Sequence, residues 1–569
     1  MHRAAAGVGL LIGVMILVVG ASAVDITDCG EITAPGHYVM KNDIEGTGNC
    51  ITITASDVIL DGMGSTITGS TLFNGVYAHH AGSITVRNLT VRKEHWGIQY
   101  KSVDGGLIEK VTATDNFFGI WVTGSTAIHL KKNTVSTNTF GIDIVMCNDC
   151  VALGNTVSEN KGGGITSAGE RNNLSWNTVT KNCDGQWPLG GIVILGSKDT
   201  VVLENTASEN KESGIVLSGS SGTTVLSNRM YKNEQSGIFL LNAEKNSVTS
   251  NDIQENRRQG IWLDSKSENT IYNNFFFNTK NAQIGANAGS NTWNIPKTPG
   301  SNIVRGPYLG GNYWGQPDGK GFSQTCTDAS PVDGICDKEY PLAKDNTDLL
   351  PLTNLTGKTG QLTPDADTSV NAGAGYDQVY GKRVPVRDLN FGGSSGIVVQ
   401  RGQRCMPGFS FWEAALIRFN LSHIAPGVGI RKATLNLTQS TLMPEPVGVH
   451  RVLLPWTERE ATFNRPCTAC TPWSGGWDGG VNFVAAPTDT IYVTGEVGRS
   501  YTWDVTADVQ TFVDGLPNHG WMLRSAETRG QSDYSRTAFY SRESTVGGVF
   551  RGPVLEIEFG TNGGGGDFG

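Results

Sequence analysis

A Gly-Ile or Gly-Val pair recurs along residues 75–261 with a spacing that excludes most folds. The pairs begin at Gly75, Gly97, Gly119, Gly141, Gly164, Gly191, Gly214, Gly237 and Gly260, in steps of 22, 22, 22, 23, 27, 23, 23 and 23 residues. Two asparagine markers keep the same phase. One set lies 13 or 14 residues after its glycine (Asn88, Asn133, Asn155, Asn177, Asn205, Asn228, Asn251 and Asn274) and the other 19 residues after (Asn116, Asn138, Asn160, Asn210, Asn233 and Asn256). Self-similarity of this period is the signature of a solenoid, in which each repeat packs on its neighbours.

The residues between the markers indicate which solenoid this is. They form short, β-branched, alternating runs such as IVIL at 192–195 and IFLL at 238–241. Three short strands per repeat predict a right-handed parallel β-helix of about ten coils, with Ile, Val and Leu filling the bore. We expect glycine to provide a positive φ at a tight corner, and asparagine to adopt the left-handed conformation and stack into amide ladders.

A charged ladder runs beside the third marker. The residue before that marker is Glu159, Lys181, Glu209, Lys232 or Glu255 on different coils. Opposite charges one strand apart attract weakly at an exposed site. We therefore interpret these glutamates as rungs of a ladder and not as catalytic acids.

The first 23 residues resemble a secretory signal peptide. A basic start is followed by an apolar stretch and by Ala21-Ser22-Ala23, an A-x-A cleavage pattern. An uncleaved membrane anchor is the alternative, since the apolar run approaches 20 residues. We expect a secreted or cell-surface protein.

Cysteine content and net charge agree with an extracellular setting. The chain holds ten cysteines, and its net charge of −9 makes nucleic acid an improbable partner. Cys29 with Cys50 and Cys326 with Cys336 are close enough in sequence to suggest local disulfides. The pairing of the other six cysteines stays open.

Residues 25–352 resemble a known family. The opening ITDCGEITAPGHYVMKNDIEG, the phrase ITITASDVILDGMGSTITG, the Gly-Ile/Asn coils and the closing GGNYWG…DGICDKEYPLAKDNTDLLPL are similar to NosD-type β-helix proteins, which are common in methanogenic archaea. The resemblance implies the β-helix fold for residues 24–352 and leaves activity open.

A linker at 353–364 precedes a region of different composition. Residues 24–352 hold 18 Lys and 7 Arg, whereas residues 365–560 hold 2 Lys and 15 Arg, and 561–569 form a Gly-rich tail. Alternating runs such as ALIRFNLS and PVLEIEF predict many strands, and TADVQTFVDG predicts one short helix with Thr506 as its N-cap. We expect a β-sandwich, in particular a jelly roll.

The second region resembles the DNRLRE (disaggregatase-related) carbohydrate-binding module. The similarity rests on ALIRFNLSHIAPGVGIRKATLNL, VGVHRVLLPWTEREATFNRP, YTWDVTADVQTFVDG, HGWMLRS and FYSRES, in that order. It departs around Cys405 and in CTACTPWSGGWDGG. The resemblance implies glycan binding, with an acidic polysaccharide as one candidate, and arginine forks suit carboxylates. The alternative is that these arginines form internal ion pairs or are solvated. Our candidate residues are Arg418, Arg451, Trp456 and Arg536.

One strand of each coil presents a second candidate surface. Outward positions after each Gly-Ile pair are Gln99, Trp121, Asp143, Thr166, Val193, Val216, Phe239 and Trp262. The coil between Gly164 and Gly191 also inserts a loop that carries Trp187. We predict a saccharide-binding groove here with Trp121, Asp143, Phe239, Trp262 and Trp187 as contact residues, since aromatic rings stack on sugars. The alternative is that other parts of the chain cover this face.

The sequence patterns for catalysis and metal binding are weaker than those for saccharide binding. A glycosidase needs two carboxylates across one bond, whereas Asp143 and Asp264 lie more than five coils apart in the predicted helix. Asp328, Asp333 and Asp337 resemble a calcium loop, although Ser330-Pro331-Val332 interrupts the D-x-D-x-D-G pattern. MCNDC at 146–150 fits a turn disulfide better than a soft-metal site.

Three functions remain open after this reading. We expect a polysaccharide-binding protein without a cofactor. The alternatives are a polysaccharide lyase or glycosidase with its groove on the β-helix, and a metal-handling accessory protein of NosD type, with calcium as the candidate ion of the acidic loop.

Overall fold

The computed structural model describes residues 23–184, 190–264, 268–286, 288–329, 332–355, 358–372, 374–377, 382–403, 410–473, 481–526, 535–546 and 548–560. Four predicted features lie outside these residues: the signal peptide up to residue 22, Trp187, Cys405 and the Gly-rich tail. The chain divides into two compact units. The first unit comprises residues up to 295 with 311–325 and 339–351, and the second comprises 296–310, 326–338 and residues from 352 onward.

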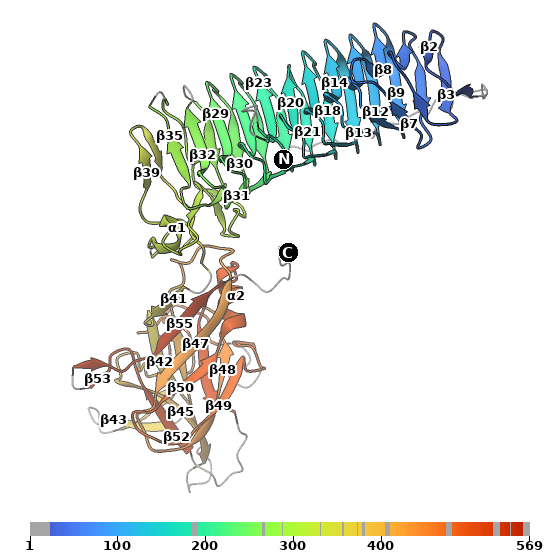
Figure 1. Cartoon of the computed structure of the whole chain (residues 1–569). Coiled ribbons are helices and arrows are strands. Elements are labelled where there is room, and N and C mark those ends of the chain that lie inside the picture. Colours follow the sequence, from blue (N-terminus) through green and yellow to red (C-terminus); the bar gives the residue numbers. More distant parts are fainter. Residues whose placement is uncertain are drawn as a thin grey trace. The chain divides into compact units, whose positions relative to one another are not determined.

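The first unit is a parallel β-solenoid, as the repeat predicts. Its strands form three parallel sheets of twelve strands each, which stack coil on coil (Figure 1). Sheet A contains β1 (Val24–Ile26), β3 (Gly36–Met40), β6 (Val58–Asp61), β9 (Gly82–Arg87), β12 (Asp104–Glu109), β15 (Thr126–Lys131), β18 (Val151–Leu153), β21 (Asn173–Ser175), β24 (Val201–Leu203), β27 (Thr224–Leu226), β30 (Ser247–Thr249) and β33 (Thr270–Tyr272).

Sheets B and C complete each coil. Sheet B contains β2 (Gly30–Ile32), β5 (Ile51–Ile53), β8 (Asn74–His79), β11 (Trp96–Lys101), β14 (Phe118–Thr123), β17 (Phe140–Val145), β20 (Ile165–Ala168), β23 (Ile192–Leu195), β26 (Ile215–Ser218), β29 (Ser236–Leu241), β32 (Gln259–Asp264) and β35 (Ala282–Ile284). Sheet C contains β4 (Ile44–Glu45), β7 (Thr66–Thr68), β10 (Thr90–Arg92), β13 (Thr112–Thr114), β16 (Thr134–Ser136), β19 (Thr156–Ser158), β22 (Thr178–Thr180), β25 (Thr206–Ser208), β28 (Arg229–Tyr231), β31 (Asp252–Gln254), β34 (Phe275–Phe277) and β38 (Tyr313–Gly315).

The bore of the solenoid is a continuous apolar core. Alternate residues of every strand point inward, and side chains such as Ile120, Val122 and Leu130 are fully buried. Burying each of these side chains contributes roughly 1.5–3 kcal/mol. The period-two pattern in the sequence therefore reports the inside and outside of the coil.

The glycines of the Gly-Ile pairs serve a different purpose from the one expected. None of the nine glycines, from Gly75 to Gly260, has a positive φ. They allow close approach instead: a Cβ on Gly119 would lie 2.4 Å from Val135 Cγ1 and 2.8 Å from the carbonyl oxygen of Gly141. The expectation of a left-handed glycine corner was therefore wrong. Glycine is required at these positions because a side chain would clash with the neighbouring coil, and not because the backbone adopts a positive φ.

The asparagine ladders are present, but in most coils the residue with the left-handed conformation is not the asparagine itself. Asn205, for example, donates its Nδ2 to Asn228 Oδ1 (2.9 Å) and to the Leu174 carbonyl (2.8 Å). Of the marker asparagines, Asn88 alone has the expected positive φ (54°), and elsewhere the left-handed residue is the one before the ladder asparagine, such as Glu204 or Ser227. The asparagines themselves are buried and satisfy main-chain groups of two neighbouring coils.

One ladder position holds a carboxyl group. Glu94 lies 19 residues after Gly75, and its N–H donates to Asn116 Oδ1 at 3.0 Å. The side chain is 1% exposed, and neither carboxyl oxygen has a hydrogen-bond partner. Burial raises the pKa of Glu94 to about 8.

The last coil is closed by short elements of the first unit. These are α1 (Phe322–Thr325) and the hairpin of β39 (Tyr340–Ala343) and β40 (Asn346–Asp348). Trp314 stacks on Phe276 at 4.6 Å between ring centroids and donates its Nε1 to Asp348. Such a cap covers apolar side chains and strand edges that the final coil would otherwise expose.

The second unit is built on antiparallel sheets, which agrees with the predicted sandwich. A four-stranded sheet has the order β41 (Thr359–Leu362), β55 (Val554–Phe559), β47 (Ile430–Thr438), β50 (Ser500–Asp504). The larger sheet has the order β49 (Asp489–Val493), β48 (Glu445–Arg451), β51 (Trp521–Ser525), β46 (Ser410–Arg418), β45 (Gly396–Gln403), β52 (Ser535–Tyr540), with β42 (Ala366–Asn371) also paired to β46. Buried residues of both sheets, including Ile417 and Leu435, share one core.

The remaining elements of the second unit are short. They are the pairs β36 (Thr298–Pro299) with β37 (Tyr308–Leu309), β43 (Ala374–Asp377) with β44 (Lys382–Pro385) and β53 (Thr545–Val546) with β54 (Val549–Phe550), the turn η1 (Val386–Asp388) and the helix α2 (Thr506–Val513). The predicted helix is present, but Val505 and not Thr506 is its N-cap residue.

The unit boundaries differ from the predicted ones. Residues 359–362, assigned to the linker, form β41, which pairs with β55 through Thr359 and Glu558. Segments 296–310 and 326–338, assigned to the β-helix, belong to the second unit. These segments have no repeat, so nothing in their sequence periodicity distinguishes the two units. No described helix is long and apolar enough to cross a membrane.

Candidate functional site

The outward row of sheet B is a continuous line of side chains. Strand pairing places Tyr77, Gln99, Trp121, Asp143, Thr166, Val193, Val216, Phe239, Trp262 and Gln283 directly above one another. The structure therefore brings together the candidate residues Trp121, Asp143, Phe239 and Trp262 on one face. Their alignment follows from the constant register of the parallel strands.

An aromatic platform of Trp96, Phe118, Trp121 and Phe140 lies on this face. Trp121 stacks on Trp96 and on Phe118, with ring centroids 5.7 and 5.6 Å apart, and Phe118 stacks on Phe140 at 5.0 Å. All four side chains are half-buried. Sequence reasoning missed three of them, although their signal was visible: each directly precedes the glycine of a Gly-Ile pair.

A second aromatic group lies farther along the same row. Phe239 and Trp262 stack with centroids 4.3 Å apart and ring planes 18° from parallel. Five strand steps separate Trp121 from Phe239, which is about 24 Å at the usual spacing of parallel strands. Rings that stack along the solenoid axis keep fixed orientations, so they present edges and outer faces at little entropic cost.

Between the two aromatic groups the face is polar and then apolar. Asp143 and Thr166 are half-buried neighbours, and burial raises the pKa of Asp143 to about 6 while the Thr166 hydroxyl opposes that rise. Val193 and Val216 follow and are buried. A Cβ on Gly190 would lie 2.8 Å from a methyl carbon of Val216, so this glycine packs directly on the apolar part.

The carboxylates of this face do not form a catalytic pair. Asp143 on β17 and Asp264 on β32 are separated by five strand steps, roughly 24 Å. Glycoside hydrolysis by two carboxylates requires a separation of roughly 5–10 Å. Asp143 and Asp264 therefore cannot act together on one glycosidic bond.

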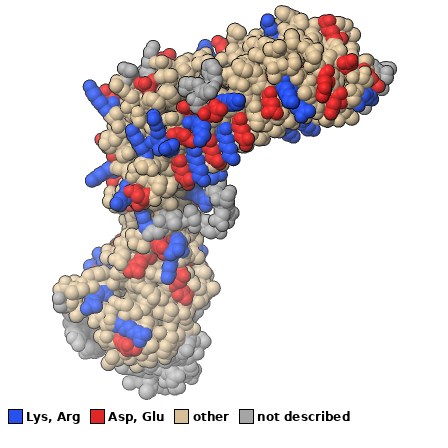
Figure 2. Space-filling model, in the orientation of Figure 1, with Lys and Arg blue, Asp and Glu red and all other residues tan. Residues whose placement is uncertain are grey.

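Charged side chains form ladders along the solenoid. Lys232 lies 3.8 Å from Glu255, as the sequence pattern predicts, and a neighbouring ladder pairs Lys211 with Glu234 at 2.5 Å. Figure 2 shows basic and acidic side chains interleaved on the coils. These pairs are exposed and contribute little each, which suits a structural role.

Three of the four candidate residues of the second unit are engaged in internal contacts. Arg418 forms an ion pair with Asp365 (2.8 Å) and lies over the ring of Trp456. Trp456 is 4% exposed and donates its Nε1 to the His519 carbonyl. Such contacts correspond to the alternative of internal pairing.

Arg451 and Arg536 differ in exposure. Arg451 Nη1 lies 3.7 Å from Asp508 Oδ1, and its side chain is 23% exposed. Arg536 is exposed, and its charge lowers the pKa of Glu413, which burial raises to about 7. Arg536 is therefore the candidate of this group that remains accessible.

Sequence reasoning missed an acidic cluster in the second unit. Asp367 is 1% exposed, and burial raises its pKa to about 7, assisted by the charges of Glu543 and Glu458. Arg542 donates its N–H to Asp367 Oδ2 and lies within 3.5 Å of both glutamates. The members come from three distant segments, so no local motif announces them.

The residues proposed as metal ligands are used in other ways. Asp328 accepts the N–H groups of Asp333 and Gly334, and Asp333 forms an ion pair with Lys297. Asp337 is exposed, and its carboxylate lies 3.4 Å from the N–H of Ala329. Within the described ranges, no group of three His, Cys, Asp or Glu side chains is arranged to hold a metal ion.

The cysteines also leave no soft-metal site among the described residues. Disulfides join Cys29 to Cys50, Cys147 to Cys150, Cys326 to Cys336 and Cys467 to Cys470. Cys183 is a buried free thiol whose Sγ donates to the Gly190 carbonyl. A lone buried thiol does not provide the ligand set that a copper ion requires.

Several solved structures are similar to part of this chain. The A-module of mannuronan C-5 epimerase AlgE6 from Azotobacter vinelandii is 13% identical over 47% of this chain and 88% of its own, with a TM-score of 0.34. The periplasmic alginate epimerase AlgG is 19% identical over 46% and 73%, with a TM-score of 0.31. A polygalacturonase from Erwinia carotovora ssp. carotovora is 11% identical over 47% and 84%, with a TM-score of 0.27.

Sequence comparison points to one family. No curated protein sequence matches the chain. The family model described as periplasmic copper-binding protein (NosD) matches residues 63–188 and 185–319. These segments contain most coils of the first unit, which is a NosD-like parallel β-helix.

Proposed function

We propose that this protein is a secreted or cell-surface polysaccharide-binding protein whose solenoid presents sheet B to an extended glycan chain. The observation that carries the proposal is the aligned outward row from Tyr77 to Gln283, which has aromatic groups at two positions about five strand steps apart. An extended polysaccharide chain is long enough to contact both aromatic groups at once, while the rungs of Val193 and Val216 between them are buried.

The chemistry of the row suits sugars. Ring edges and outer faces of Trp121 and Trp262 offer contact for the C–H surfaces of pyranose rings. Asp143 and Thr166 place a carboxyl and a hydroxyl group between them, which can exchange hydrogen bonds with sugar hydroxyls. The arrangement combines broad apolar contact with a few polar groups, as ligand sites commonly do.

The first alternative function is polysaccharide cleavage. It is disfavoured by the distance between Asp143 and Asp264, which exceeds the range for a pair of catalytic carboxylates. Neither carboxylate has a described acidic neighbour on its own face of sheet B within one strand step.

The second alternative function is metal handling. The residues that the structure describes do not fit a copper or calcium site, because their thiols are paired or isolated and their acidic loop is occupied by main-chain amides and Lys297. Four disulfides are in keeping with an oxidising location outside the cytoplasm.

Native gel electrophoresis in gels that contain soluble polysaccharides tests the proposal. Neutral and acidic polymers should be tried separately, with release of reducing ends measured in parallel. We expect retardation by at least one polymer without release of ends. Unretarded migration in every gel would refute binding, and release of ends would show that the protein is an enzyme.

A further inference from the structure

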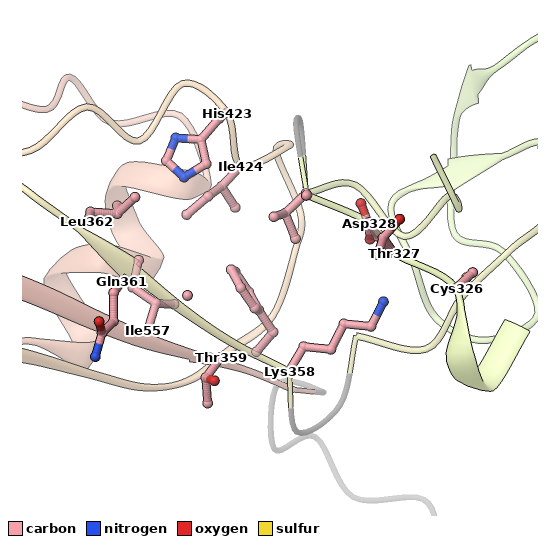
Figure 3. A pocket seen from close by; sticks show the side chains of 14 residues that line it. Cys326, Thr327, Asp328, Lys358, Thr359, Gln361, Leu362, His423, Ile424 and Ile557 are labelled. Atoms are coloured by element: carbon pink, nitrogen blue, oxygen red, sulfur yellow. The ribbon is translucent and has the colours of Figure 1, made fainter. Parts of the chain in front are cut away.

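The second unit contains a pocket that lies apart from all candidate residues of the sandwich sheets. Its volume is about 670 Å³, and it is lined by residues 326–329, 332, 358–362 and 423–424 and by the end of β55. All of these segments belong to the second unit. Figure 3 shows His423, Leu362 and Lys358 from different segments placed around one space.

One side of the pocket is apolar. Val332, Ile424, Ile557 and Phe559 line it and are each at most 9% exposed. The Phe559 ring packs against Gly360, where a Cβ would lie 3.6 Å from the ring carbon Cε2. Because residue 360 has no side chain, the space in front of this aromatic wall stays open.

The other side carries opposite charges. Lys358 is half-buried, and burial lowers its pKa, while the charges of Asp328 and Asp337 oppose that shift. Its ammonium donates to Thr353 Oγ1 at 3.1 Å, and no described carboxylate lies within 4.0 Å of it. In Figure 3 the Lys358 side chain extends toward Asp328.

Asp328 retains capacity to accept hydrogen bonds. It is 8% exposed, and burial raises its pKa to about 6. Oδ1 accepts the N–H of Asp333 at 3.1 Å and Oδ2 that of Gly334 at 2.9 Å. A carboxylate has about four acceptor positions and an ammonium three donors, so both side chains can bind a further group.

We propose that this pocket binds one neutral sugar ring. Adjacent hydroxyls of a hexose would donate to Asp328 and accept from Lys358, while its C–H surface lies on the wall of Phe559 and Ile424. A nearby pair of opposite charges favours a hydroxylated ring over an anion or a cation, since either ion would meet one repulsive partner. The volume accommodates a mono- or disaccharide.

This site is independent of sheet B, so it tests a different claim from the proposed function. The full chain is titrated with glucose, galactose, mannose, glucuronate and glucosamine, and saturation-transfer NMR measures binding. We expect at least one neutral hexose to bind saturably, with affinity reduced at least tenfold by Lys358→Met and by Gly360→Leu, which fills the open space. Lys432→Met, which removes a lysine outside the pocket, should leave binding unchanged.

Three results would overturn the proposal. They are the absence of saturable binding by any neutral hexose, binding of the charged sugars alone, and equal affinity of the Lys358→Met protein. If Gly360→Leu prevents folding, Lys358→Met alone decides the outcome. Thermal unfolding of Lys358→Met and Lys432→Met then shows whether the two proteins are equally well folded, so that lost binding is not mistaken for lost structure.

Discussion

Asn312 donates both its N–H and its Nδ2 amide to one oxygen of Asp348, at 2.8 and 3.4 Å, where the asparagine ladder of the solenoid ends. Every amide of that ladder donates toward the next coil, from Asn133 to Asn274 and then Asn312. The last donor therefore needs an acceptor that is not another coil. A carboxylate from the β39–β40 hairpin meets this need and also accepts Trp314 Nε1 at 2.8 Å.

Asp348→Ala should destabilise the first unit substantially. The substitution leaves the buried N–H groups of Asn312 and Trp314 without this acceptor, each at a cost of roughly 1–3 kcal/mol, and also removes the acceptor of the part-buried N–H of Leu350. Denaturant unfolding followed by tryptophan fluorescence measures the loss. Glu339→Ala, an exposed position before the same hairpin, is the control, and equal stability of the two variants would contradict the capping role.

Gly214→Ala should also destabilise the coil, by roughly 2–4 kcal/mol, because its Cβ would lie 2.8 Å from Asn233 Nδ2 and from the Gly237 carbonyl. Gly30→Ala is the matched control, since a Cβ there meets nothing within 4 Å and the residue has no positive φ. Thermal unfolding of both variants compares them. A tolerated alanine at position 214 would show that coil spacing is softer than the geometry indicates.

Glu94 should make stability depend on pH. Its folded pKa of about 8 lies above the ordinary value of 4.5, so the folded state holds a proton that the unfolded state has released between these values. The free energy of unfolding should fall as pH rises from 4.5 to 8, by on the order of 1–3 kcal/mol relative to Glu94→Gln. Urea unfolding at several pH values measures this difference, and parallel pH curves for the two proteins would rule out the buried, uncompensated carboxyl.

Much of the fold could be predicted from the sequence because the repeat carries it. Spacing of the Gly-Ile pairs sets the coil length, and constant coil length sets the register that aligns Trp121 with Asp143 and Phe239 with Trp262. Periodicity does not contain the physical reason why glycine or asparagine recurs at a given position of the repeat. Gly119 avoids a clash with the next coil, and Glu204 takes the left-handed conformation in front of its ladder asparagine.

The second unit was less accessible to sequence reasoning. Arg418 and Trp456 looked like ligand contacts, yet they pack on each other, and side-chain chemistry alone does not distinguish the two uses. The pocket between Asp328, Lys358 and Phe559 joins segments that are distant in sequence. Only tertiary structure brings such residues together, so neither a motif nor a period could have indicated it.

The central claim is that an extended glycan binds along sheet B. Single tryptophan substitutions on and off this sheet test the claim most directly. Electrophoretic retardation by the polysaccharide that retains the wild-type protein should be compared for Trp121→Ala, Trp262→Ala and Trp176→Ala. Trp176 is the control because it is 56% exposed and lies between strands of sheets A and C. We predict that the first two substitutions each weaken binding at least fivefold and that the third leaves it unchanged. Equal retardation of all three variants, or a loss confined to Trp176→Ala, would contradict the account.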